Sequence, residues 1–341
     1  MAQNYLGSLP KHDPLHGYLS YDILPQVSDR VRRPEFRVFG LNCTNNQVYL
    51  YEEKHTRAKI IGKFFIDGPH QSVDKASKRA RREYHNLVKL RNHGFSANPQ
   101  QVIKPLAYNA NLNHLLVEEY VQGEDLGKIL HKALYENQSA LLYSKLTLLA
   151  HFLASMHNRT AIGERVNFNQ DCHYFTQLVG QLKCNKGLSS WDADELYSLC
   201  HQWRESPQMW YDQQVLVHGD ATPVNFIFGN EHEVTAIDLE RMKYADRTFD
   251  VGRIVGEIQH YFLNAKRRKS DAEPFIGHFL WEYARHFPDH SRTFEAITAR
   301  LPFQLAITLM RIARNPWITP GHSHYLIKEA KKTLRGAYGN S

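Results

Sequence analysis

The stretch from Val215 to Glu240 constrains the fold of this chain more than any other. It contains three short apolar segments, and polar side chains stand at their ends. Asp220 follows the first segment, Asn225 comes five positions later, and Asp238 ends the third segment. Short apolar runs separated by turn residues such as Gly and Asn are typical of strands. We therefore expect Asp220, Asn225 and Asp238 to gather at one end of a small sheet.

These three side chains predict a metal site. Two carboxylates and one amide oxygen are hard ligands, which suit Mg²⁺ better than a softer metal. A single aspartate is more often a helix cap or a turn residue, but three polar side chains at this spacing favour the metal site. Glu240 lies two positions after Asp238 and points the same way on an extended chain. It either supports the metal, meets a substrate, or is an exposed loop acid.

Length and composition limit the class of protein. With 341 residues the chain is long enough for two lobes. Its four cysteines form no C-x-x-C pair, its N-terminus lacks the pattern of a signal peptide, and no apolar run approaches bilayer length. We therefore expect a cytoplasmic protein with no membrane span. The net charge of +7 favours anionic partners. Nucleic acid is not expected, because the basic runs have no interleaved aromatic residues.

The chain changes character near residue 120. Residues 1–34 contain four prolines and little periodicity, which predicts an irregular N-terminal arm. Residues 35–120 are expected to form an N-terminal lobe, with a helix over 74–91 and strands over 36–41, 47–51, 58–65, 102–107 and 115–121. Residues 121–341 are expected to form a helical C-terminal lobe, with helices over 125–134, 141–157, 192–205, 250–265, 274–287, 294–314 (interrupted near Pro302) and 324–334. Residues 158–190 show no clear pattern and are expected to be irregular.

An ion pair is expected inside the first lobe. Glu83 is the one acid on the apolar face of the helix over 74–91. A buried carboxylate is costly unless it is paired, so Glu83 needs a cationic partner. The strand over 58–65 places Lys59 and Lys63 on one face, and either lysine is a candidate. The alternative is that these are unrelated surface charges.

This order of elements, with H-G-D-x-x-x-x-N at 218–225 and I-D-L-E at 237–240, resembles the aminoglycoside phosphotransferase and choline kinase group of protein-kinase-like enzymes. The resemblance covers roughly residues 36–265. It implies that residues 35–120 form a nucleotide-binding lobe and that residues 121–341 form a catalytic and substrate lobe. It implies an α+β, bilobal fold with a five-stranded antiparallel sheet and one helix in the first lobe and a mostly helical second lobe. It also implies ATP and Mg²⁺ as cofactors, and transfer of the γ-phosphoryl group to a hydroxyl of a small molecule such as a sugar, an amino sugar or an amino alcohol.

The resemblance assigns a role to each matching residue. Asp220 is expected to orient the acceptor hydroxyl and take its proton, while Asn225 and Asp238 hold the metal. Lys63 is expected to contact the α- and β-phosphates and to pair with Glu83. The hinge that receives the adenine corresponds to Glu118, Glu119, Tyr120 and Val121. His218 is expected to brace the loop, and Asp250 to cap a helix and brace the loop without a catalytic role.

One departure from the family pattern favours a different function. The segment between the first two strands, with Asn42, Thr44, Asn45 and Asn46, lacks the glycines of a phosphate-binding loop. Asn45-Asn46 is expected to form a tight hairpin turn. The second candidate is therefore a nucleotide-binding, pseudokinase-like regulator with little transfer activity.

The acceptor is not identified by the motifs. The run over 266–269 is expected to be a solvated helix end, with binding of an anionic partner as the alternative. Four acids are candidates for a cation-binding pocket: Asp246, Asp250, Glu257 and Glu273. An acidic pocket beside Asp220 would indicate an amine-bearing acceptor, an aromatic one a choline-like cation, and a basic one a phosphorylated or carboxylated acceptor.

Overall fold

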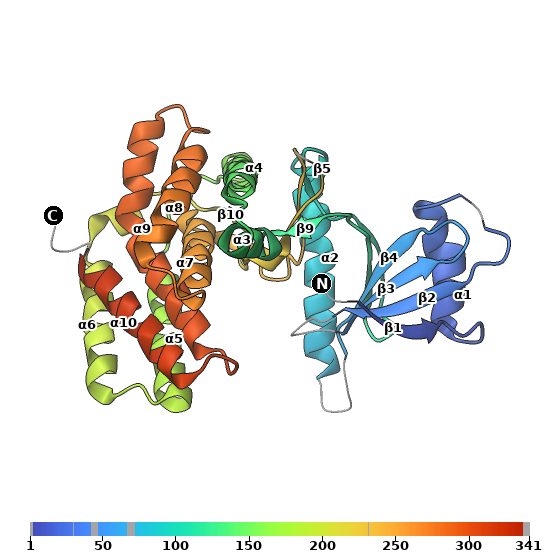
Figure 1. Ribbon diagram of the computed structural model, residues 1–341, viewed down its shortest axis with the longest axis horizontal. Helices are drawn as coiled ribbons and strands as arrows, with labels where there is room; N and C mark the ends of the chain where they lie inside the picture. The colour runs from blue at the N-terminus through green and yellow to red at the C-terminus, as the bar shows by residue number, and fades with distance from the viewer. Residues whose placement is uncertain (1–2, 30, 42–46, 67–71, 231, 337–341) are drawn as a thin grey trace. The chain divides into compact units, whose positions relative to one another are not determined.

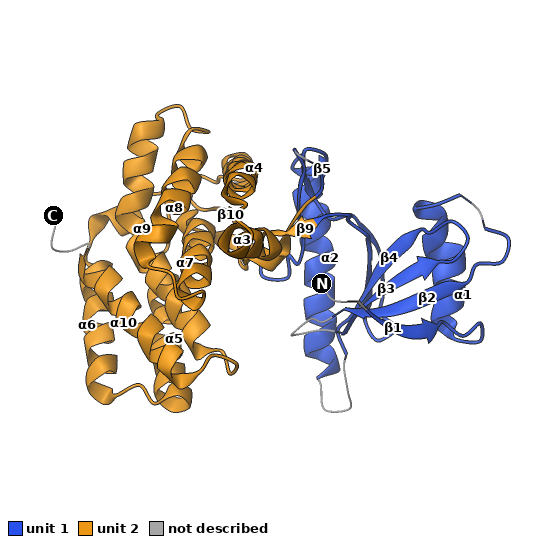
Figure 2. Ribbon diagram, in the orientation of Figure 1, with its two compact units in different colours: residues 1–123, 229–241 blue, residues 124–228, 242–341 orange. Residues whose placement is uncertain are grey.

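The structure is a computed structural model that describes residues 3–29, 31–41, 47–66, 72–230 and 232–336. The expected turn at Asn45-Asn46 and the polar side chains of Asn42 and Thr44 lie outside these residues. The chain forms two compact units, one of residues 1–123 and 229–241 and the other of residues 124–228 and 242–341 (Figure 2). The division expected at residue 120 thus differs from the structure, in which a later segment returns to the first unit.

The first unit is built on a six-stranded sheet of order β1-β2-β3-β4-β8-β7, with neighbouring strands antiparallel (Figure 1). The strands are β1 (Gln3–Ser8), β2 (Phe36–Leu41), β3 (Gln47–Glu53), β4 (Lys59–Phe64), β7 (Pro105–Asn109) and β8 (Leu115–Glu119). Five of these correspond to expected strands. The sixth, β1, lies in the segment that we expected to be irregular. Its pairing with β2 shifts register between Tyr5 and Gly7, which interrupts the alternation that marks a strand in a sequence.

The rest of the expected arm also belongs to the core of the first unit. Helix α1 (Pro14–Tyr18) continues through a π-helical turn, Leu19–Ile23, into a 3-10 turn, Leu24–Gln26. Four of their leucine and isoleucine side chains are buried against the sheet: Leu15, Leu19, Ile23 and Leu24. The prolines at 14 and 25 begin helical turns, where a missing N–H costs nothing. The prediction of an irregular arm was wrong because it treated these prolines as breakers.

The other face of the unit carries helix α2 (Val73–Asn92) and three short strands that pair in the order β5 (Ser96–Ala97), β6 (Gln100–Val102) and β12 (Val234–Ala236). Strand β12 pairs in parallel with β6, and this pairing brings residues 229–241 into the first unit. The single strand expected over 102–107 is two strands, β6 and β7. The second starts at Pro105, a residue that cannot donate to a strand ladder and is tolerated at the first position.

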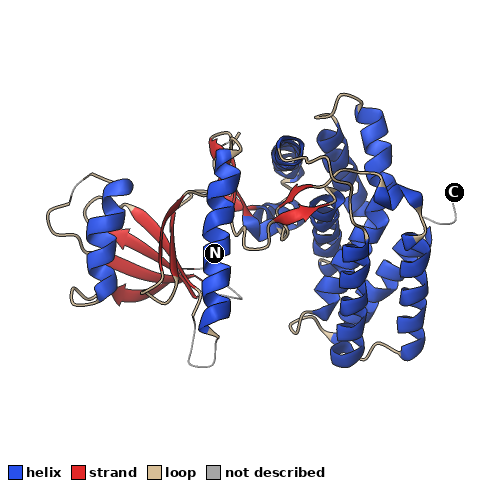
Figure 3. Ribbon diagram, turned by 180° about the vertical axis from the view of Figure 1, so that it is seen from behind, coloured by secondary structure: helices blue, strands red, loops and turns tan. Residues whose placement is uncertain are grey.

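The second unit is mostly helical, as expected (Figure 3). Its helices are α3 (Leu126–Tyr135), α4 (Ser139–Arg159), α5 (Asn169–Lys186), α6 (Ser190–Arg204), α7 (Thr248–Asn264), α8 (Lys269–Ala284), α9 (His290–Arg314) and α10 (Pro320–Gly336). Four short strands accompany them: β9 (Glu124–Asp125), β10 (Val215–Val217), β11 (Phe226–Phe228) and β13 (Lys243–Ala245). Among the described residues, no helix is both long enough and apolar enough to cross a bilayer.

Two expectations for the second unit were wrong. Helix α5 occupies the segment that we expected to be irregular, with Phe175, Leu178 and Leu182 buried. Polar residues and a glycine interrupt its apolar face, so the helical period is weak in the sequence. Helix α9 runs through Pro302 without the expected interruption.

Candidate active site

The first unit contains a buried lysine held between carboxylates. The Lys63 Nζ atom lies 2.8 Å from both carboxylate oxygens of Glu83 and 3.0 Å from Asp238 Oδ1. The Lys63 and Glu83 side chains are 8% and 0% exposed, and Asp238 is 34% exposed. Strand β4 supplies the lysine, α2 the glutamate, and the segment after β12 the aspartate. Lys63, not Lys59, is therefore the partner of Glu83.

A third carboxylate acts on the same lysine. Glu118 is buried on β8, where its neighbour across the ladder is Ile61, two residues before Lys63 on β4. Burial alone would lower the pKa of Lys63, but the charges of Glu83, Asp238 and Glu118 outweigh it and raise that pKa. Burial raises the pKa of Glu118 to about 7, although Lys63 opposes the shift. The ammonium group of Lys63 thus interacts with the charges of three carboxylates, and it remains charged at neutral pH.

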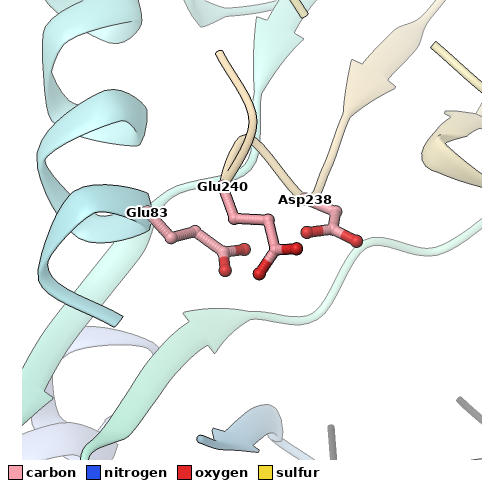
Figure 4. Close-up of side chains that lie close together, drawn as sticks. All are labelled: Glu83, Asp238 and Glu240. Carbon is pink, nitrogen blue, oxygen red and sulfur yellow. The ribbon is translucent and has the colours of Figure 1, made fainter. Parts of the chain in front are cut away.

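Glu240 is buried and is held by helix α2. Arg79 donates to its Oε2 atom at 2.8 and 3.2 Å, and Asn86 donates to the carbonyl of Leu239 at 2.7 Å. The interpretation of Glu240 as an exposed loop acid was therefore wrong, since helix α2 covers the loop. Glu83, Asp238 and Glu240 offer carboxylate oxygens that lie within 4.8 Å of one another, an arrangement able to hold a cation (Figure 4).

The segment expected to form the hinge follows strand β8. Glu119 accepts a hydrogen bond from the backbone N–H of Lys104 at 2.8 Å, and Tyr120 and Val121 come directly after the strand. The Lys59 Nζ atom lies 4.9 Å from the centroid of the Tyr120 ring, a cation-π distance. Lys59 therefore contacts this segment and takes no part in the ion pair of Lys63.

In the second unit, Asp220 and Asn225 lie on one loop between β10 and β11. The Asn225 side-chain amide donates to the backbone carbonyl of Asp220 at 2.8 Å, and Asn225 is buried. Because Nδ2 makes this bond, Oδ1 is the atom of Asn225 that can face a cation. Arg311, on α9, donates to Asp220 Oδ1 at 2.5 Å.

Asp250 braces this loop from helix α7. Its carboxylate accepts the backbone N–H groups of His218 at 2.6 Å and Gly219 at 3.1 Å, and His157 Nε2 lies 3.3 Å away. His218 is itself fully buried, and its Nδ1 accepts from the N–H of Asp220 at 3.3 Å. Asp250 is not the helix cap that we expected. Helix α7 begins two residues earlier, where the side chain of Asp246 accepts the N–H of Thr248 at 2.8 Å.

Residues 41–286 match the phosphotransferase enzyme family. The chain belongs to this family. The match spans both units and includes Lys63, Glu83, Asp220, Asn225 and Asp238. In a separate search, no curated protein matches the sequence.

Solved structures share the fold of this phosphotransferase family member. An ethanolamine kinase from Plasmodium vivax aligns with a TM-score of 0.57 at 14% identity, over 89% of this chain and 83% of that one. The ADP-bound aminoglycoside phosphotransferase APH(2'')-Ib aligns with a TM-score of 0.55 at 14% identity, over 96% and 99%. Choline kinase LicA from Streptococcus pneumoniae aligns with a TM-score of 0.50 at 15% identity, over 87% and 92%. The predicted protein-kinase-like fold is thereby confirmed.

The family resemblance did not reveal every charged residue around the site. Arg79 carries no motif signal, although it precedes Glu83 by four residues and so shares its side of the helix. The resemblance assigns Glu118 to the hinge and gives no sign that its carboxylate is buried near Lys63. Arg253 and Arg311 carry no motif signal, and only the packing of α7 and α9 brings them near Asp220.

We expect the Asp250→Ala variant to be less stable than the unmodified protein by about 3 kcal/mol, because two buried backbone N–H groups lose a charged acceptor. Burial alone would raise the pKa of Asp250, but its bonds to His157 and the loop lower it. Its contribution is therefore present above the pKa of the unfolded aspartate and is lost at lower pH. Urea unfolding at neutral pH measures the change. The exposed Glu273, changed to alanine, is the control, and a loss below about 1 kcal/mol would contradict the bracing role.

Proposed function

We propose that the protein transfers the γ-phosphoryl group of ATP to a hydroxyl of a small molecule and requires Mg²⁺. The observation that carries this proposal is Lys63, a buried cation shared by Glu83 and Asp238. Phosphoryl transfer demands positioning and charge neutralisation more than covalent chemistry from the protein. A fixed ammonium group beside an aspartate that is partly open to solvent meets that demand.

In the proposed reaction Lys63 binds the α- and β-phosphates while Glu83 holds its orientation. Asp238 and Asn225 would hold Mg²⁺, because the carboxylate and amide oxygens that they offer are ligands that this ion prefers. When bound, Mg²⁺ would neutralise charge that develops on the phosphate oxygens. Glu240 lies near Asp238 and supports the same site. The backbone of residues 118–121 receives the adenine.

Asp220 is the proposed catalytic residue of the second unit. It orients the acceptor hydroxyl and takes its proton as the new P–O bond forms. The bond between the γ-phosphorus and the bridging oxygen breaks, and its electron pair stays with ADP. Asp250 and His218 hold the loop and do not touch the reacting atoms.

The first test is metal-dependent ADP release. We expect the protein with ATP, Mg²⁺ and a suitable hydroxyl acceptor to release ADP, and a chelator to abolish the release. Because Asp238 is a proposed ligand, Asp238→Asn is expected to raise the Mg²⁺ concentration for half-maximal activity by about tenfold or more. The exposed Asp74, changed to asparagine, is the matched control in the first unit. An unchanged metal requirement in Asp238→Asn would refute this ligand assignment.

A nucleotide-binding regulator with little transfer activity is the second candidate, and one observation favours it. Arg311 is already paired with Asp220, the residue that must receive the acceptor. Tight binding of ATP without ADP release in the presence of any acceptor would support the regulator. ADP release that depends on an added acceptor would exclude it.

A further inference from the structure

Two arginines of the second unit interact with the charge of Asp220, and one of them, Arg311, contacts it directly. Arg311 donates to Asp220 Oδ1 at 2.5 Å, and its Nη1 atom is 3.9 Å from Glu257 Oε1. The side chains of Arg311 and Asp220 are 14% and 15% exposed, so this ion pair is reached by solvent. A ligand approaching Asp220 therefore meets a guanidinium group as well as a carboxylate.

Arg253, on α7, is the second arginine and is only 2% exposed. Its Nε and Nη1 atoms are buried and have no hydrogen-bond partner among the described residues. Burial and, to a smaller extent, the charge of Arg311 lower the pKa of Arg253 to about 10, so the group stays cationic at neutral pH. Leaving charged N–H groups unsatisfied is costly. This cost indicates a site arranged for an anionic partner.

The packing of two helices fixes these arginines. A Cβ atom at Gly252 would lie 2.4 Å from the Cβ of Gln304, and one at Gly256 would lie 2.5 Å from Thr308 Cγ2. Only glycines allow α7 and α9 to approach so closely. Arg311 comes three residues after Thr308, so it extends from the same side of α9. Arg253 follows Asp250, the brace of the loop, by three residues and shares its side of α7.

The four candidate acids, all among the described residues, do not form a site for a cationic acceptor. Asp246 is bonded to Arg300 at 2.9 Å, and Asp250 is bonded to the loop backbone. Glu273 is exposed on α8. Glu257 remains, and its Oε1 atom lies 3.9 Å from Arg311 Nη1, while burial raises its pKa despite the charges of Arg253 and Arg311. The candidate cation-binding pocket made from these acids is therefore not supported.

We propose that the acceptor carries an anionic group, a carboxylate or a phosphate ester, that is bound by Arg311 and Arg253. This inference rests on the proposed phosphotransferase function. Before the acceptor binds, Arg311 is paired with Asp220. The anionic group of the acceptor replaces Asp220 as the partner of Arg311, and Asp220 becomes available to accept the proton of the hydroxyl. The ion pair between Arg311 and Asp220 thus favours acceptors whose anionic group can replace Asp220 as the partner of Arg311.

Matched acceptors that differ only in charge test the proposal. One series is glycerate, glycerol phosphate, glycerol and aminopropanediol, and a longer one is gluconate, glucitol and glucamine. ADP release is measured with each at fixed Mg²⁺-ATP. We expect kcat/KM to be higher for the anionic members of a series than for its neutral and amine members. Comparing glycerate with glycerol phosphate shows whether the site prefers a carboxylate or a phosphate ester.

Variants of Arg311 separate acceptor binding from a structural effect. We expect Arg311→Gln to raise the KM of the best anionic acceptor by about tenfold or more, since it removes a charged hydrogen-bond donor. The KM for ATP should stay unchanged, and kcat/KM for glycerol should not fall, because the ion pair that a neutral acceptor cannot replace is absent from this variant. Arg311→Lys, which keeps the charge, should recover part of the loss. Arg314→Gln on the same helix is the matched control, because Arg314 contacts Gln181 and lies apart from Asp220.

The possible outcomes distinguish this inference from the function on which it rests. Preference for the amine acceptors, or equal effects of Arg311→Gln on charged and neutral acceptors, would overturn the inference and leave the phosphotransferase function intact. No ADP release with any acceptor would overturn both. Preference for anionic acceptors that disappears in Arg311→Gln and partly returns in Arg311→Lys would support the inference.

Discussion

We expect Asp220→Asn to lower the rate of phosphoryl transfer by about 10³-fold or more, with little change in the binding of ATP. Asparagine has nearly the shape of aspartate but cannot take the proton of the acceptor hydroxyl. Arg311 also loses a charged partner, although the loop keeps its braces at His218 and Asp250. Single-turnover measurement of the phosphorylated product separates the chemical step from product release.

Two controls accompany Asp220→Asn. Calorimetry with a non-hydrolysable ATP analogue shows whether nucleotide binding is intact. The unfolding midpoint shows whether the structure of the loop is also intact. Glu273→Gln, an exposed change in the same unit, should retain full activity. If Asp220→Asn transfers phosphate at the unmodified rate, Asp220 is not the proton acceptor and the proposed reaction fails.

Some features of the site are predictable from the sequence because a charged residue interrupts a regular pattern of apolar residues. Glu83 is the one acid on an apolar helical face, so its burial and its need for a cation follow from the period alone. Lys59 and Lys63 share one strand face, so the strand period alone does not choose between them, and the family resemblance is what indicates Lys63. The choice depends on where along β4 the helix α2 packs, which is a tertiary property.

Other features depend on contacts that no local pattern records. Strand β8 is buried on both faces, so alternation gives no sign that Glu118 points towards Lys63. Arg311 lies in the last turn of α9, where a basic residue is equally well explained by the helix dipole. Strand β1 can be identified only from its pairing with β2 and not from its own sequence pattern. In each case the missing information is the identity of the neighbouring element.

The stability of the first unit depends on the balance between the charge of buried Lys63 and those of its neighbouring carboxylates. We expect Lys63→Met to show this dependence most clearly. Methionine fills a similar volume but leaves Glu83, Glu118 and Asp238 without their shared cation. Removing one partner from a buried ion pair typically costs about 3–5 kcal/mol. We therefore expect a large fall in the unfolding midpoint at pH 8 in metal-free buffer. Transfer activity should be lost as well, because Lys63 is the proposed phosphate contact.

The destabilisation of Lys63→Met should become smaller as the pH falls. Burial raises the pKa of both Glu83 and Glu118, and Lys63 opposes both shifts, so removing Lys63 raises these pKa values further. A carboxyl whose pKa is higher in the folded state than in the unfolded state destabilises the protein as the pH rises above its unfolded pKa. Near pH 5 the acids are protonated in the variant, and part of the lost stability returns. Thermal unfolding at pH 5 and pH 8 measures the difference.

Lys59→Met is the matched control for this experiment. Lys59 lies on the same strand, but it contacts the Tyr120 ring and is not part of the buried pair. We expect its removal to cost less than about 1 kcal/mol at either pH, because a partly exposed cation-π contact contributes little. If Lys63→Met and Lys59→Met are equally stable, or if the loss in Lys63→Met is the same at pH 5 and pH 8, the carboxylates do not depend on Lys63. The charge balance proposed for the first unit would then be wrong.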